Sequence, residues 1–68
     1  MNQVINKQQY KFQKGDIIRY KPAGLMCKCL SIDVYGDITY ILGEEIKDKG
    51  ARKFLRYEVD KWEKVDDN

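Results

Sequence analysis

Short segments in which apolar and polar residues alternate run along the chain, separated by glycine, proline and aspartate. The most apolar stretch extends from Leu25 to Leu42. It consists of two arms of strand-forming residues on either side of Val34-Tyr35-Gly36-Asp37. Gly36-Asp37 has the composition of a tight turn. The pattern therefore predicts a β-hairpin at the centre of the fold.

The remaining segments predict further strands around this hairpin. Lys14-Gly15-Asp16 and Pro22-Ala23-Gly24 are turn signals, and a single helical turn is expected at 58–61. We predict a mainly β fold, a small antiparallel SH3-like barrel, because closing the sheet removes edges that such a short chain tolerates poorly. The five predicted strands lie near residues 16–21, 25–33, 37–43, 52–57 and 62–65.

The 68 residues correspond to one small domain. We expect residues 1–11 to form a flexible N-terminal arm, because this segment is polar apart from a few residues. Residues 12–65 are predicted to form the barrel, and residues 66–68 a polar C-terminal tail. About 60% of the unfolded surface is buried in a domain of this size, so the core is expected to be small.

The strand at 25–33 has two alternating faces, and neither of them is cleanly polar. The bulkier face is our prediction for the core, although a register slip of one residue would exchange the two. In the strand at 52–57, Phe54 is predicted to point inward, and the opposite alternation is the second option. The bulkier face holds Met26, Lys28, Leu30 and Ile32, and the other holds Leu25, Cys27, Cys29 and Ser31.

The two cysteines, Cys27 and Cys29, are separated by one residue. On a strand their side chains point to the same side at about 6–7 Å along the chain, which is unsuitable for a mutual disulfide. The chain has no histidine and no third cysteine, so it lacks the usual ligand set of a zinc site. We expect both thiols to act as small apolar side chains, without a metal or other cofactor.

The composition argues against an enzyme. Histidine, the commonest general base, is absent, and the five glycines are isolated turn residues rather than a phosphate-binding loop. The first residues, MNQVINKQQYKF, lack the basic start and apolar core of a secretory signal, and no apolar run approaches a membrane span. We therefore expect a non-catalytic cytoplasmic protein that does not enter a membrane.

The order of several motifs is similar to that of a group of small, largely uncharacterised phage and gut-bacterial mobile-element proteins. The shared features are the turn Phe12-x-Lys14-Gly15-Asp16, the strand Asp37-Ile38-Thr39-Tyr40, and a C-terminal strand with Asp60, Trp62, Glu63 and Val65. The resemblance covers most of residues 12–65. It implies an SH3-like fold and a viral or mobile-element source, and it transfers no active site.

A binding role follows from the exposed aromatic and basic residues that such a barrel presents. A protein-interaction module, encoded by a phage to modulate a host protein, is our first hypothesis. The alternatives are a nucleic-acid-binding barrel and a homo-oligomeric structural or ligand-sequestering protein. The net charge is only +2, with +5 over residues 1–29 and −3 over residues 30–68, which is a weak basic signal for nucleic acid. The candidate binding residues are Arg19, Tyr20, Lys21, Tyr35, Lys53, Arg56, Tyr57 and Trp62, with Tyr40 as a further aromatic candidate.

Overall fold

The computed structural model describes residues 12–65 of the chain. The predicted arm at 1–11 and the predicted tail at 66–68 lie outside the described residues. The mainly β prediction is confirmed, and the predicted helical turn is a short 3-10 helix. The elements are β1 (Ile17–Tyr20), β2 (Leu25–Tyr35), β3 (Ile38–Glu45), β4 (Phe54–Glu58), η2 (Val59–Lys61) and β5 (Trp62–Lys64).

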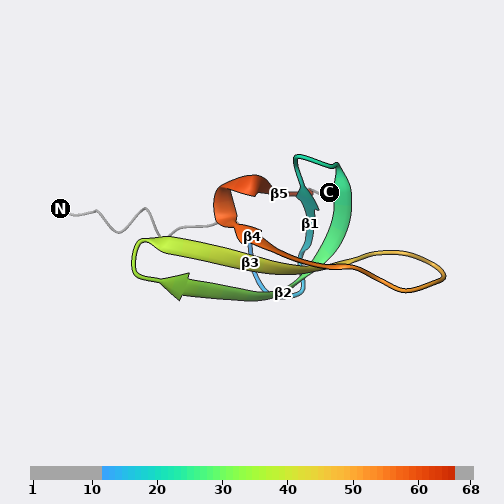
Figure 1. Cartoon of the computed structure of the whole chain (residues 1–68), viewed down its shortest axis with the longest axis horizontal. Coiled ribbons are helices and arrows are strands. Elements are labelled where there is room, and N and C mark those ends of the chain that lie inside the picture. The colour runs from blue at the N-terminus through green and yellow to red at the C-terminus, as the bar shows by residue number, and fades with distance from the viewer. Residues whose placement is uncertain (1–11, 66–68) are drawn as a thin grey trace.

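The five strands form one antiparallel sheet in the order β4-β3-β2-β1-β5. β2 is long and curved: residues 25–28 pair with β1 on one side, and residues from Cys27 to Tyr35 pair with β3 on the other (Figure 1). β4 and β5 are the two edges, and within residues 12–65 no ladder joins them. The sheet is therefore strongly curved without backbone closure, so the structure shows the antiparallel sheet but not a closed barrel.

The predicted central hairpin is present as β2 and β3. Tyr35 pairs with Ile38, which leaves Gly36 and Asp37 as a two-residue turn. Gly36 has φ of 62°, a conformation that glycine adopts without strain and that suits the first position of a type II′ hairpin turn. The turn fixes the register of the hairpin from Tyr35 back to Ser31, and Asp33 consequently lies opposite Tyr40.

The prediction for the core face of β2 is wrong over the first part of the strand. Cys27 and Cys29 are completely buried, whereas Met26 and Lys28 are exposed. The register shifts between Cys29 and Ser31, so one extra residue is accommodated and the alternation changes phase. Beyond this bulge Ile32 packs against the core, as predicted.

Small residues face the core at Cys27 and Cys29 because the indole ring of Trp62 fills this part of the core, where 3% of Trp62 is exposed. A Cβ on Gly43 would lie 2.8 Å from Trp62 Cη2 and 3.0 Å from Cys27 Cβ. The ring thus lies against the core side of β2 and β3 at this point, which leaves little room for a side chain larger than cysteine at position 27. The remaining core residues are Ile18 and Ile41.

The inward prediction for Phe54 is also wrong. Phe54 is 62% exposed, whereas Leu55 packs against the core. In the β3–β4 ladder Leu55 pairs with Gly43 and Phe54 pairs with Glu44. Since Gly43 faces Trp62, its neighbour Leu55 must face the core as well, and Phe54 is left on the opposite side of the sheet.

Candidate binding surfaces

The structure separates the candidate binding residues into two groups on opposite sides of the sheet. Tyr35 and Arg56 lie on the outer face, which we define as the side carrying Tyr40, Leu42 and Arg56 and facing away from the core. Three further candidates lie around the core side, and the others are dispersed along the strand ends. The core-side group consists of Tyr20, Tyr57 and Trp62.

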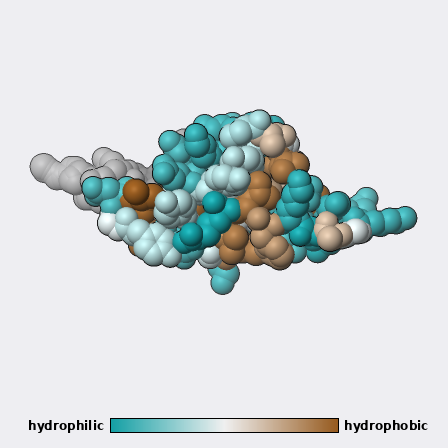
Figure 2. Space-filling model, viewed as in Figure 1, coloured by the Kyte–Doolittle hydropathy of each residue, from teal (hydrophilic) through white to brown (hydrophobic). Residues whose placement is uncertain are grey.

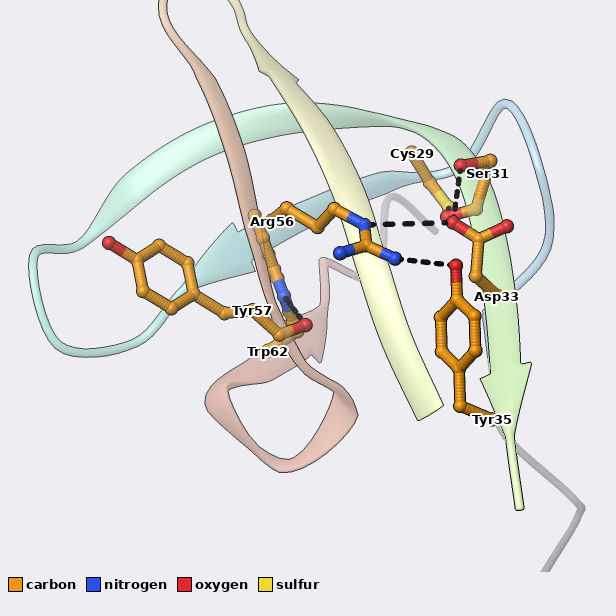
Figure 3. Close-up of polar contacts among 7 residues, drawn as sticks. All are labelled: Cys29, Ser31, Asp33, Tyr35, Arg56, Tyr57 and Trp62. Carbon is orange, nitrogen blue, oxygen red and sulfur yellow. Dashed lines mark hydrogen bonds and ion pairs between the residues drawn. The ribbon is translucent and has the colours of Figure 1, made fainter. Parts of the chain in front are cut away.

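The outer face is centred on the guanidinium group of Arg56. Its Cζ atom lies 4.8 Å from the ring centre of Tyr40 and 5.4 Å from that of Tyr35. Arg56 Nη2 donates a hydrogen bond of 2.9 Å to the Tyr35 hydroxyl, and Arg56 Nε lies 3.9 Å from Asp33 Oδ2 (Figure 3). The two tyrosine rings meet edge to face at 5.9 Å. We call these four residues the Arg56 cluster.

Each member of the Arg56 cluster is positioned by the ladder of the sheet. The hairpin register places Asp33 and Tyr40 side by side, and Arg56 pairs with Leu42, the residue on the same side of β3 as Tyr40. The Arg56 side chain therefore extends across β3 to β2, as Figure 3 shows. Ser31 donates a hydrogen bond of 3.3 Å to Asp33 Oδ2, which orients the carboxylate toward the arginine.

The Arg56 cluster is ordered although it remains accessible to solvent. The side chain of Arg56 is 44% exposed and Tyr35 is 57% exposed. Cation–π contacts of this kind are worth about 0.5–1 kcal/mol at exposed sites. An arginine held by two rings and a carboxylate loses little further side-chain freedom when it is contacted, and this favours binding.

The core-side group closes the gap between the two edges of the sheet. The rings of Tyr20 and Tyr57 stack at 4.4 Å with an interplanar angle of 21°, and Tyr20 lies 5.4 Å from the Trp62 ring. Trp62 Nε1 donates a hydrogen bond of 3.2 Å to the Tyr57 carbonyl oxygen. Loss of solvation and the hydrogen bond with Tyr57 raise the pKa of Tyr20. These contacts join β1 and β5 to β4, so this group is primarily structural.

The other basic candidates lie in or next to β1 and just before β4. Arg19 forms an ion pair with Glu63 on the neighbouring strand β5. The backbone amide of Lys21 donates to the Lys61 carbonyl oxygen at the end of the β1–β5 ladder, and Lys53 directly precedes β4. Of these three side chains, that of Arg19 is therefore already held beside a carboxylate.

One member of the Arg56 cluster, Asp33, was not among the candidate binding residues. The hairpin register could have identified it, because a two-residue turn at Gly36-Asp37 places Asp33 opposite Tyr40 and two residues from Tyr35. No local signal connects Arg56 with these residues. Its contact depends on the pairing of β4 with β3, which is set by tertiary structure.

The two thiols are free and lie in the core. Burial raises the pKa of both thiols. The charge of Glu45 raises the pKa of Cys27 further, and the charge of Asp16 raises the pKa of Cys29 further. Both are therefore poorly suited to act as nucleophiles at neutral pH. Within residues 12–65 no three or more cysteine or acidic side chains come together in a way that could hold a metal ion.

No helix in the described part of the chain has the length and apolar character needed to cross a membrane. Comparison with known proteins does not place the chain in a family: no family model, no curated protein and no solved structure matches it.

Proposed function

We propose that this protein is a small non-catalytic protein-interaction module that binds its partner through the Arg56 cluster. The observation that carries the proposal is the exposed guanidinium of Arg56, which lies against the rings of both Tyr35 and Tyr40. Arginine and tyrosine are enriched among the residues that dominate protein–protein binding energies. A preorganised pair of these residue types on a sheet surface suits that role.

The charges of the outer face favour a protein over a nucleic acid. Each of the three arginines in the chain lies against a carboxylate: Arg19 against Glu63, Arg52 against Glu44 at 3.6 Å, and Arg56 against Asp33. Phosphate contacts would have to compete with these carboxylates for the same guanidinium groups. A surface on which positive and negative groups are interleaved instead matches a protein surface of mixed charge.

The apolar neighbours of the Arg56 cluster define the partner further. Ile38 and Phe54 lie on the same side of the sheet and are 43% and 62% exposed. Figure 2 shows hydrophobic surface over the middle of the molecule, interleaved with hydrophilic side chains. We propose a partner protein surface with a central apolar side chain and a nearby carboxylate, the first to contact Phe54 or the tyrosine rings and the second to accept from Arg56.

The proposed setting follows from the strand order and from the resemblance to phage proteins. Five strands in the order β4-β3-β2-β1-β5, with a 3-10 turn before the last, support an SH3-like plan in which side chains of Tyr20, Tyr57 and Trp62 bridge the open edges. On this proposal the partner is a cytoplasmic protein of the host cell.

The test is photo-crosslinking in cells that produce the protein. A photoreactive phenylalanine derivative replaces Tyr40 at the cluster and, as the control, Lys49 in the loop between β3 and β4. Adducts are identified by mass spectrometry, and the affinity for the crosslinked protein is then measured with purified components. We expect Arg56→Glu to weaken binding about tenfold or more, because it places a second anion beside Asp33. Lys49→Glu, which makes the same change of charge away from the face, should bind as the unchanged protein does.

Three results would contradict the proposal. The first is equal crosslinking from positions 40 and 49. The second is an adduct with nucleic acid rather than with protein. The third is an Arg56→Glu variant that binds the crosslinked protein as tightly as the Lys49→Glu control does.

A further inference from the structure

The outward edge of β4 carries backbone groups that no other described strand pairs with. The amide of Glu45 donates to the Lys53 carbonyl oxygen at 2.8 Å, which makes 45 and 53 a hydrogen-bonded pair of the β3–β4 ladder. Such pairs recur at every second residue of an antiparallel ladder. Leu55 and Tyr57 therefore direct their backbone groups toward β3. Phe54, Arg56 and Glu58 direct theirs toward the open edge.

The side chains along this edge are self-complementary. Glu58 has no ion pair within residues 12–65. Arg52, two residues before Phe54, lies 3.6 Å from Glu44, the residue that pairs with Phe54, so its guanidinium lies on the same side of the sheet as Phe54. Its side chain is 50% exposed, so a second carboxylate can also reach it. We propose that a second copy of this chain pairs antiparallel with β4, with Leu55 opposite the partner's Leu55. In this register Arg52 lies opposite the partner's Glu58, and Glu58 lies opposite the partner's Arg52. The two-fold axis thus creates two ion pairs of the same kind.

The same register also covers the most exposed apolar side chain of the strand. Phe54 lies opposite the partner's Arg56, where its ring packs on the aliphatic stem of that arginine. Arg56 extends toward β2, so its guanidinium stays in its own cluster. The Arg56 cluster consequently remains accessible in the dimer, whereas Phe54 is covered, so that in the dimer a partner protein would contact the tyrosine rings rather than Phe54. The proposal goes beyond the proposed function without depending on it.

The neighbouring registers are less favourable. Shifting the pairing by two residues in one direction places Arg56 opposite the partner's Arg56, and shifting it in the other direction places Arg52 opposite the partner's Arg56. Like charges that face each other across strands are destabilising. The register centred on Leu55 is the one of these three in which arginine faces glutamate.

The first experiment reverses the charges of the two ion pairs. Sedimentation velocity is measured for the unchanged protein, Arg52→Glu, Glu58→Arg, an equimolar mixture of these two variants, and Asp37→Arg in the β2–β3 turn as the control. We expect each edge variant alone to dimerise about tenfold more weakly, because both symmetry-related pairs become repulsive.

The equimolar mixture should recover the dimer. When one chain carries Arg52→Glu and the other carries Glu58→Arg, the two substituted positions face each other across the interface. They form an ion pair of reversed direction. The unchanged Glu58 of the first chain then faces the unchanged Arg52 of the second, so both pairs are again attractive.

A monomer that persists to about 1 mM would overturn the proposal, as would a mixture that associates no better than the separate variants. Recovery in the mixture, with Asp37→Arg unchanged, would support it. Circular dichroism of every variant confirms that the sheet is retained, so that loss of folding is not mistaken for loss of the dimer.

The second experiment tests the register directly. Residues that face each other without mutual hydrogen bonds in an antiparallel pair have Cα atoms about 4.5 Å apart, within the range of a disulfide. We expect Leu55→Cys to form a covalent dimer on mild oxidation and Arg56→Cys to do so much less. The native thiols of Cys27 and Cys29 are buried and provide little background. Faster crosslinking at position 56 than at position 55 would overturn the proposed register.

Discussion

The ring of Trp62 lies so close to the backbone of Gly43 that a Cβ at position 43 would come within 2.8 Å of Trp62 Cη2. The Trp62 side chain of β5 therefore packs directly against the backbone of β3 at Gly43. The two edges of the sheet are held together in the same region by the stacked rings of Tyr20 and Tyr57. Gly43 is thus needed for the curvature of the sheet rather than for an unusual backbone angle.

Gly43→Ala should destabilise the protein by about 1–3 kcal/mol, the usual range for one methyl group forced into a packed core. The new methyl would meet both the Trp62 ring and Cys27 Cβ, and neither can move away without disturbing a strand. Urea unfolding followed by circular dichroism measures the loss. The double variant Gly43→Ala/Trp62→Phe serves as the control, because the smaller ring leaves room for the methyl. The close contact would be refuted if Gly43→Ala cost the same in both backgrounds.

Removal of the indole should have a larger effect. Trp62→Ala is expected to cost about 3–5 kcal/mol, most of the stability of a domain of this size. Trp62→Phe, which keeps an aromatic ring, should cost clearly less. Circular dichroism is the appropriate probe, because Trp62 is the only tryptophan in the chain. A loss below about 1 kcal/mol for Trp62→Ala would place the ring outside the stabilising core.

Much of this architecture is predictable from the sequence. The hairpin turn at Gly36-Asp37 and the approximate strand positions follow from local composition. The inward cysteines are not predicted, because residue size favours Met26 over Cys27. The space beside the Trp62 ring has room only for small side chains. The position of this ring depends on the pairing of strands that are distant in sequence, so local composition does not reveal it.

The outward Phe54 and the contact of Arg56 with Tyr35 escape prediction for a related reason. The sequence leaves open which alternation of β4 faces inward, and the answer comes from the pairing of Leu55 with Gly43. Tyr35 and Arg56 are both candidates for binding, but their sequence separation gives no indication that they meet. The site therefore depends on the register of β4 against β3.

The buried thiols provide a prediction on pH. The pKa values of Cys27 and Cys29 are raised, chiefly by burial, so the folded protein retains protons that the unfolded chain releases. This contribution to stability is fully present below the thiol pKa of the unfolded chain and is lost as the pH rises through the higher pKa of the folded state. Between about pH 8 and about pH 10 the free energy of unfolding should fall more steeply than in Cys27→Ala/Cys29→Ala. Equal slopes, measured by urea unfolding, would contradict this expectation.

The Arg56 cluster should contribute little to folding. Arg56→Ala removes an exposed ion pair and two exposed ring contacts, and we expect a loss of about 1 kcal/mol or less. Urea unfolding measures the free energy of unfolding of Arg56→Ala and of Arg19→Ala, a control that removes the exposed ion pair with Glu63. A loss of about 3 kcal/mol for Arg56→Ala alone would make the cluster a structural element and weaken the case for a binding surface.

The salt dependence of binding tests the central claim most directly. Affinity is measured over a series of salt concentrations for the partner identified by crosslinking at Tyr40, and in parallel for single-stranded and double-stranded oligonucleotides. Because each arginine is already paired with a carboxylate, we predict that the affinity for the partner protein depends only weakly on salt concentration. We also predict that Arg56→Glu lowers this affinity. Tight oligonucleotide binding that falls steeply as salt rises would show that phosphates are the natural ligand and would contradict the account.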